Sequence, residues 1–221
     1  MTDAATLLVV TGPPGSGKST VSAALAELWE PSALVEGDAF FTFLRRGYVS
    51  PWLPGSRAQN DTTTRAAAAA AGTFARGGIH VVYDGVIGPW FLPGFAALTG
   101  LAAIDYVVLL PPVETCLHRV ATRTGHGFTD LGAARHMHEE FARATAQIAP
   151  GTAPPADDDA PDATPDATPG TTSAGTTSAG TTPGGTTPGV VLTDLPDDVT
   201  GVAEAIRAAV ASGATRYTVA G

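Results

Sequence analysis

The chain of 221 residues is long enough for one α/β domain. Its formal net charge is −9, and five of the negative charges belong to aspartates between residues 157 and 166. The remaining balance of −4, with few basic clusters, argues against a protein that grips long nucleic acid by its backbone. The lone Cys116 cannot form an internal disulfide, no apolar run could span a membrane, and no signal-like segment opens the chain, so we expect a cytoplasmic protein with no membrane partner.

A glycine-rich loop separates an apolar run, Thr6–Thr11, from a helical pattern that extends from Lys18 to Trp29. The run does not alternate, which is typical of a central parallel strand buried on both faces. The loop matches the phosphate-binding pattern G-x-x-x-x-G-K-[ST], in which backbone N–H groups face phosphate oxygens. A glycine-rich turn that matches by chance is the alternative. The predicted nucleotide-binding residues are Gly12, Pro13, Pro14, Gly15, Ser16, Gly17, Lys18, Ser19 and Thr20.

Two residues of this loop have specific chemical roles in the prediction. Lys18 is the only lysine in the chain, beside eleven arginines, and it would reach the β- and γ-phosphates of a bound nucleotide. The Ser19 hydroxyl would bind Mg²⁺. The motif therefore predicts nucleotide binding with Mg²⁺, without stating what is done with the nucleotide.

A second short strand, 33–35, is followed by Asp38. This residue therefore lies at the carboxyl end of the strand, where open α/β sheets bind their ligands. The segment 40–56 is rich in aromatic residues and turn formers, and it forms either a wall of a substrate pocket or a satellite core beneath a long connection. An alanine-rich helix over Arg57–Arg76 comes next. The candidates for contacts with a substrate are Asp38, Phe41, Arg57 and Trp90.

The third predicted strand, 79–84, ends at Asp84, the position of an acid that orients Mg²⁺ in nucleotide-binding domains. An ordinary strand-end aspartate that caps the next segment is the alternative. A helix through about residue 98, a strand over 103–110 and a helix over 113–122 follow.

Arg119 and Arg123 lie one helical turn apart and precede a glycine-flanked loop around His126. We predict that these arginines close over the phosphates of the nucleotide, with surface salt bridges as the alternative. A helix from Asp130 to about Ile148 comes next. Its two histidines, at positions 136 and 138, fall on different helical faces, so we predict no zinc pair there.

Residues 150–189 have a different composition, dominated by Thr, Pro, Ala, Gly, Ser and Asp, without aromatic or large aliphatic side chains. We predict a disordered insertion without a catalytic role. A fifth strand from residue 190 and a helix over about 199–211 complete the pattern. The predicted organisation is one domain in two parts, 1–149 and 190–221, separated by the insertion.

Five strands that alternate with helices predict a parallel sheet with helices on both faces, a three-layer α/β fold. With the phosphate loop, Asp38, Asp84 and the arginine pair at strand ends, the chain resembles the small P-loop kinases of the nucleoside-monophosphate-kinase-like group. Gluconate and shikimate kinases and chloramphenicol phosphotransferase are the members it is most similar to, within AAA-type ATP-binding domains. The resemblance covers about residues 5–149 and 190–212.

The resemblance implies transfer of the γ-phosphoryl group of ATP to a hydroxyl of a small molecule. It also implies catalytic roles for Lys18, Asp38, Arg119 and Arg123, with Ser19 and Asp84 at the Mg²⁺. The acceptor region does not match the residues that bind sugar acids or shikimate in those kinases, so the resemblance does not identify the acceptor. The aromatic content of this region suggests a natural product or antibiotic. A polynucleotide or nucleotide-sugar kinase-like enzyme and a nucleotide-binding regulatory protein are the alternatives. The oligomeric state is not predicted.

Overall fold

A computed structural model describes residues 5–123, 128–146, 190–193 and 198–219. The predicted insertion over 150–189 and the residue His126 lie outside this described part. In chain order the elements are β1 Leu7–Thr11, α1 Lys18–Ala26, β2 Ser32–Glu36, α2 Gly37–Phe41, α3 Arg57–Arg76, β3 His80–Asp84, α4 Leu92–Thr99, β4 Ala103–Leu109, α5 Val113–Thr122, α6 Leu131–Ala146, β5 Val190–Leu192, α7 Val199–Ser212 and β6 Arg216–Thr218.

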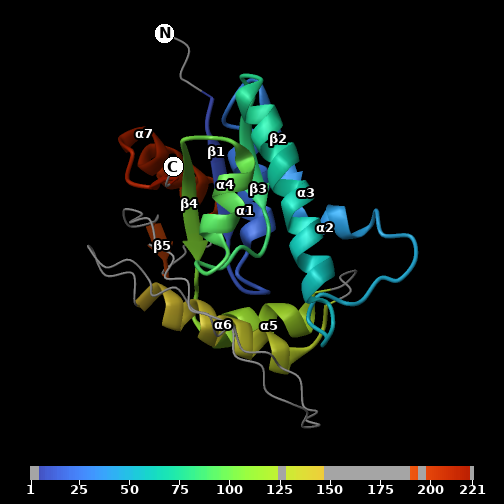
Figure 1. Ribbon diagram of the computed structural model, residues 1–221. Coiled ribbons are helices and arrows are strands. Elements are labelled where there is room, and N and C mark those ends of the chain that lie inside the picture. Colours follow the sequence, from blue (N-terminus) through green and yellow to red (C-terminus); the bar gives the residue numbers. More distant parts are fainter. Residues whose placement is uncertain (1–4, 124–127, 147–189, 194–197, 220–221) are drawn as a thin grey trace, which may run out of the picture.

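The sheet has the strand order β2-β3-β1-β4-β5, with all neighbours in this path parallel. Figure 1 shows α3 and α4 on one face and α7 on the other, while α5 and α6 lie across the end toward which β4 points. The predicted three-layer fold with five parallel strands is therefore confirmed. Because β5 pairs with β4, Val190–Leu192 belong to the same sheet as the first strands.

The alternation of side chains along β1 divides the core into two halves. Leu7 and Val9 face a cluster that includes α3 and α4, whereas Leu8 and Val10 face a cluster that includes α1 and α7. All five residues of β1 are buried, as the unalternating apolar run predicts for a strand covered on both faces.

The alanine content of α3 lets this helix approach its neighbours closely. Ala67, Ala68 and Ala71 are fully buried against the sheet. At Gly72 an added Cβ would lie 2.0 Å from the carbonyl oxygen of Thr99 in α4, so only glycine fits this crossing. Small side chains thus hold α3 in place, and α3 carries the segment 42–56 at its first turn.

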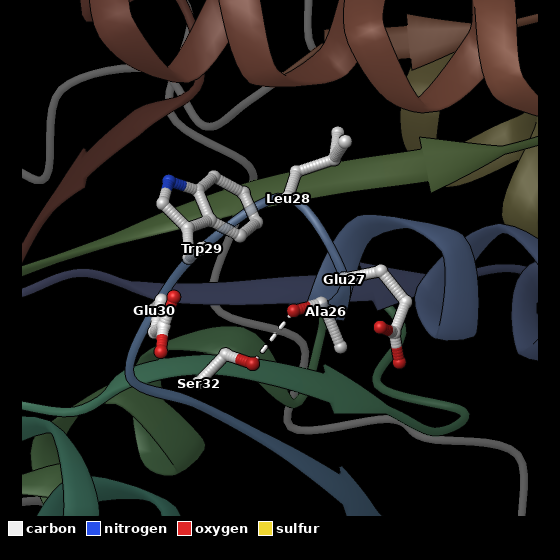
Figure 2. A pocket seen from close by; sticks show the side chains of 6 residues that line it. All are labelled: Ala26, Glu27, Leu28, Trp29, Glu30 and Ser32. Atoms are coloured by element: carbon white, nitrogen blue, oxygen red, sulfur yellow. Dashed lines mark hydrogen bonds between the residues drawn. The ribbon is translucent and has the colours of Figure 1, made fainter.

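The helix α1 ends at Ala26, three residues before the predicted end. The Ser32 hydroxyl donates a hydrogen bond of 2.6 Å to the Ala26 carbonyl oxygen and replaces the next helical bond there. Trp29 leaves the helix and stacks on His80, with 5.6 Å between ring centroids. Ala26, Trp29 and Ser32 help to line a hollow of about 430 Å³ at this end of α1 (Figure 2).

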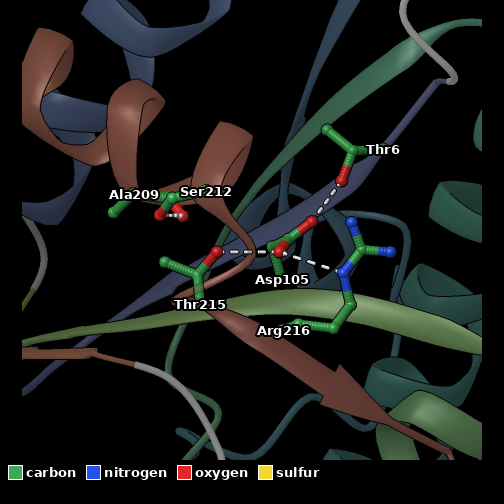
Figure 3. A network of polar contacts seen from close by, with 6 residues as sticks. All are labelled: Thr6, Asp105, Ala209, Ser212, Thr215 and Arg216. Atoms are coloured by element: carbon green, nitrogen blue, oxygen red, sulfur yellow. Dashed lines mark hydrogen bonds and ion pairs between the residues drawn. The ribbon is translucent and has the colours of Figure 1, made fainter.

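Two short elements, α2 and β6, were not predicted. Each is too short for a hydrophobic period to be recognised, and β6 pairs with β4 in the antiparallel sense. The buried Asp105 of β4 holds β6 by side-chain contacts (Figure 3). Its carboxylate accepts hydrogen bonds from Thr6 Oγ1 at 2.5 Å and from Thr215 Oγ1 at 2.7 Å, and it forms an ion pair with Arg216 at 3.5 Å.

Replacing Asp105 with alanine should lower the free energy of unfolding by about 3 kcal/mol, because each buried partner left unsatisfied costs about 1–3 kcal/mol. Urea denaturation measures this loss. The Arg207→Ala variant removes an exposed charge from α7 and serves as the control, with an expected change below about 0.5 kcal/mol. Equal stabilities of the two variants would show that the Asp105 contacts do not hold β6.

Candidate nucleotide and phosphoryl-transfer site

The glycine-rich loop between β1 and α1 has a backbone that only glycines allow. Gly12, Gly15 and Gly17 have φ angles of 152°, 82° and 92°. An added Cβ at Gly12 would lie 2.2 Å from the carbonyl oxygen of Leu109, and one at Gly15 would lie 2.2 Å from that of Cys116. The loop is therefore fitted against the end of β4 and the first turns of α5.

Polar groups of the loop are available to an anion. Gly17 precedes α1 without any side-chain cap, so the first N–H groups of the helix receive no bond from a capping side chain. The Ser16 hydroxyl is enclosed and has no hydrogen-bond partner among the described residues. Free N–H groups at a helix N-terminus, with Lys18 as the first helical residue, are suited to phosphate oxygens.

Asp84 ends β3 beside this loop and is 8% exposed. Burial raises the pKa of its carboxyl group, while hydrogen bonding with Ser19 and the charge of Lys18 lower it. Its Oδ1 atom is enclosed and unpartnered within the described structure. An unsatisfied carboxylate oxygen beside a serine hydroxyl fits a hard divalent cation, which takes one or two protein oxygens and completes its shell with phosphate and water.

Asp38 lies in the first turn of α2 and is exposed. Its negative charge raises the pKa of Asp84 and of Tyr83, and it also raises the pKa of Arg123 on the opposite side. Such influence requires proximity, because the interaction between charges falls with distance and is screened by water. Asp38 thus lies close enough to Asp84 and to one arginine of the predicted pair for its charge to act on both.

Tyr83 is a residue of this region that sequence reasoning missed. Its ring is buried between two glycines. An added Cβ at Gly37 would lie 2.4 Å from the Tyr83 Oη atom, and one at Gly85 would lie 2.7 Å from its Cε1 atom. Burial, followed by the charges of Asp38 and Asp84, raises the pKa of its phenol. In the sequence, only the two glycines at positions 37 and 85 could have indicated that Tyr83 lies at this site. They indicate a large neighbouring side chain only when the pairing of β2 with β3 is known.

The two arginines of the predicted pair lie at the end of α5. Arg119 is in its last turn, whereas Arg123 follows the helix with an extended backbone, φ −68° and ψ 141°, so the predicted shared helical face does not extend to it. Arg119 Nη1 donates to the Gly15 carbonyl oxygen at 3.4 Å, so it lies against the glycine-rich loop. Arg123 Nη2 donates to the Phe128 carbonyl oxygen at 3.1 Å, while its Nε is enclosed without a partner among the described residues. Burial lowers the pKa of Arg123, opposed by the charge of Asp38.

The other substrate candidates lie at three separate places. Phe41 ends α2, and Arg57 is exposed at the first position of α3. Trp90 packs against Phe141 of α6, with 5.4 Å between ring centroids. Within the described ranges, no hydrogen bond or ion pair joins these three residues to Asp38 or to the glycine-rich loop.

Other polar clusters do not compete with this site. The described residues contain no group of three or more His, Cys, Asp or Glu side chains that could hold a metal ion. His136 pairs with Glu140 and His138 contacts the Pro111 carbonyl oxygen, so the two histidines have different partners.

The hollow of Figure 2 lies at the end of α1 that is far from the glycine-rich loop. None of the described helices combines the length and apolar character needed to cross a bilayer.

Comparisons with solved structures show the fold of small P-loop kinases. Shikimate kinase from Acinetobacter baumannii in complex with shikimate matches with a TM-score of 0.53 at 15% identity, over 95% of this chain and 94% of that chain. A chain of the Pnkp1/Rnl/Hen1 RNA repair complex matches with a TM-score of 0.52 at 22% identity. That match covers 64% of this chain but 45% of the other, so this protein spans less than half of the repair chain's length.

No curated protein matches the chain. A protein-family model does: the model AAA_33, described as an AAA domain, matches residues 7–147. These residues contain the glycine-rich loop, both carboxylates and both arginines described above. Because the match spans well over half of the chain, the protein belongs to this AAA-domain family.

Proposed function

We propose that this protein is a phosphotransferase that moves the γ-phosphoryl group of ATP to a hydroxyl of a small molecule. The observation that carries the proposal is the position of Asp38, an exposed carboxylate after β2 whose charge acts on both Asp84, at the end of the neighbouring strand, and Arg123. A protein that only binds nucleotide has no need of a carboxylate on the acceptor side of the phosphates. Phosphoryl transfer does need one group there to orient the attacking hydroxyl.

On the nucleotide side, the chain's groups neutralise and orient phosphate. The loop N–H groups bind phosphate oxygens, and Lys18 reaches toward the group to be transferred. Arg119 is held against Gly15 of the loop, where its guanidinium lies at the phosphate side of α5. Ser19 and Asp84 would hold Mg²⁺, which when bound supplies positive charge to the β- and γ-phosphate oxygens.

On the acceptor side, Asp38 orients the attacking hydroxyl and accepts its proton as the oxygen forms the new bond to phosphorus. The bond from phosphorus to the β-phosphate oxygen breaks at the same time, and ADP leaves with that electron pair. Arg123, the residue after α5, is near enough to Asp38 for the two charges to interact, and in this proposal its guanidinium stabilises the negative charge spread over the transferred group.

The acceptor that we propose is a partly apolar, hydroxylated small molecule such as a natural product or antibiotic. The segment between α2 and α3 exposes several large apolar side chains beside the acceptor side: Phe43, Tyr48, Trp52 and Leu53 are 70%, 48%, 39% and 49% exposed. Side chains of this kind bind apolar ligand surface, and the net charge of −9 disfavours a long polyanionic acceptor.

A screen of ATP consumption over a library of hydroxylated metabolites and antibiotics tests this proposal directly. We expect one structural group of acceptors to give a product heavier by one phosphoryl group, identified by mass spectrometry. Stoichiometric ATP consumption without any phosphorylated product would contradict transfer to a small molecule.

Replacing Lys18 with alanine should reduce turnover by at least about 100-fold, because the only ammonium group near the phosphates is lost. The release of ADP and the calorimetric affinity for ATP with Mg²⁺ measure the effect. Arg65→Ala removes an exposed cation from α3 and is the matched control. Unchanged ADP release by Lys18→Ala would exclude the loop as the nucleotide site.

Replacing Asp38 with asparagine should leave the affinity for ATP within about 3-fold of wild type while transfer falls by about 10²–10⁴-fold. The amide keeps the shape of the side chain but neither takes a proton nor attracts Arg123. Asp61→Asn, at an exposed position of α3, controls for loss of one charge. Full transfer activity in Asp38→Asn would remove Asp38 from the acceptor site.

Replacing Asp84 with asparagine should raise the Mg²⁺ concentration needed for half-maximal turnover by about 10–100-fold, because a neutral amide is a weaker ligand for a hard cation. A Mg²⁺ titration at saturating ATP measures the shift. Glu27→Gln, at the far end of α1, should leave the titration unchanged. Identical curves for Asp84→Asn and wild type would contradict the cation site.

A further inference from the structure

The segment between α2 and α3 touches the chain just beyond the end of α5. Trp52 lies edge-on to Phe128, with 4.9 Å between ring centroids and 86° between the ring planes. Edge-to-face aromatic pairs of this geometry are attractive beyond the area they bury. Trp52 is therefore a point of contact between the acceptor side and the arginine side of the site.

Polar side chains at the start of α3 form hydrogen bonds with the backbone that precedes Trp52. Gln59 Nε2 donates to the Val49 carbonyl oxygen at 2.6 Å, and Gln59 Oε1 accepts from the Val49 N–H at 2.9 Å. The Asn60 side-chain amide and the Ser56 hydroxyl both donate to the Pro51 carbonyl oxygen at 2.8 Å. The backbone just before Trp52 is thus tied to the start of a long helix.

The Phe128 side of the contact holds an arginine. The Phe128 ring is buried with Val120 and Ala134, which fixes its backbone against α5 and α6. Its carbonyl oxygen accepts the hydrogen bond from Arg123 Nη2, and Arg123 faces the charge of Asp38. The described contacts therefore run from Trp52 through Phe128 to the guanidinium of Arg123.

We propose that Trp52 is a positioning residue: by packing on Phe128 it fixes the carbonyl oxygen that orients Arg123 toward the transferred phosphoryl group. This inference rests on the proposed phosphotransferase function and adds to it a mechanical link between the acceptor segment and an arginine. Trp52 touches no reacting atom in this proposal. With water in place of the acceptor, its effect reaches the reaction through Arg123.

The link predicts which kinetic quantity changes. The glycine-rich loop and Lys18 bind the nucleotide in its ground state, so loss of the Trp52 ring should barely alter nucleotide affinity. Arg123 acts on charge that develops during transfer, so its misplacement should lower kcat. A purely structural role for Trp52 would instead lower thermal stability and affinity together.

The kinetic test compares Trp52→Ala, Trp52→Phe and the control Phe74→Ala, which removes an exposed aromatic ring from α3, with ATP, Mg²⁺ and water as the acceptor. We expect Trp52→Ala to lower the rate of ATP hydrolysis by about 10-fold with the affinity for ATP changed by less than about 3-fold. Trp52→Phe should restore the rate to within about 3-fold of wild type, and Phe74→Ala should match wild type. In an Arg123→Ala background, Trp52→Ala should cause no further loss, since coupled residues are not additive. Additive losses would overturn the proposal.

A second readout does not depend on turnover. In the Trp29→Phe, Trp90→Phe background, Trp52 is the only tryptophan, and its emission reports its contact with Phe128. We expect ADP with Mg²⁺ to change this emission when Arg123 is present and to leave it unchanged in Arg123→Ala, while calorimetry still detects binding. The same response in both proteins, or no response in either, would overturn the proposal. Absence of nucleotide binding by the wild-type protein would instead contradict the proposed function itself.

Discussion

The register of the parallel strands around β1 determines where the glycine-rich loop, Asp84 and Asp38 lie relative to one another. Val10 of β1 is paired with Asp84 of β3, and the next residue, Thr11, is paired with Val108 of β4. This places the carboxylate of Asp84 beside the start of the glycine-rich loop. The pairing of Glu36 with Asp84 extends the alignment to β2, so Asp38 follows at the same edge. A slip by one residue would turn each strand's side chains to the opposite face and separate these groups.

The sequence predicts the parts of the site that depend on local pattern. The phosphate loop has a defined spacing, and Asp84 directly ends an apolar run, so both were recognisable without the sheet. The alanine-rich helix was predicted with its observed bounds, Arg57–Arg76, because its composition and its glycine ending are local signals. The strand order, in contrast, is a property of the folded chain, and the sequence pattern only limited it to a parallel α/β sheet.

The parts that were not predicted depend on contacts between distant segments. Tyr83 belongs to an apolar run that predicts a buried strand, so nothing in the sequence singles it out. It comes close to Asp38 only when β2 and β3 pair. The contact of Trp52 with Phe128 joins positions that no periodicity relates. The aromatic segment therefore could not be assigned to a pocket wall or to a satellite core from sequence. In the structure Trp52 contacts Phe128 while Phe43 stays 70% exposed, so the segment is only partly packed.

The two short strands β5 and β6 share one edge of β4. β5 pairs with residues 107–109 of β4 in the parallel sense, and β6 pairs with residues 103–105 in the antiparallel sense. A strand of seven residues that was covered over only half of its edge would present free N–H and C=O groups, which pair readily with strands of other molecules. By folding back beside β5, the last strand closes this edge. Beyond β4, this side of the sheet then ends in two strands of only three residues each, which offer little edge for pairing with other molecules.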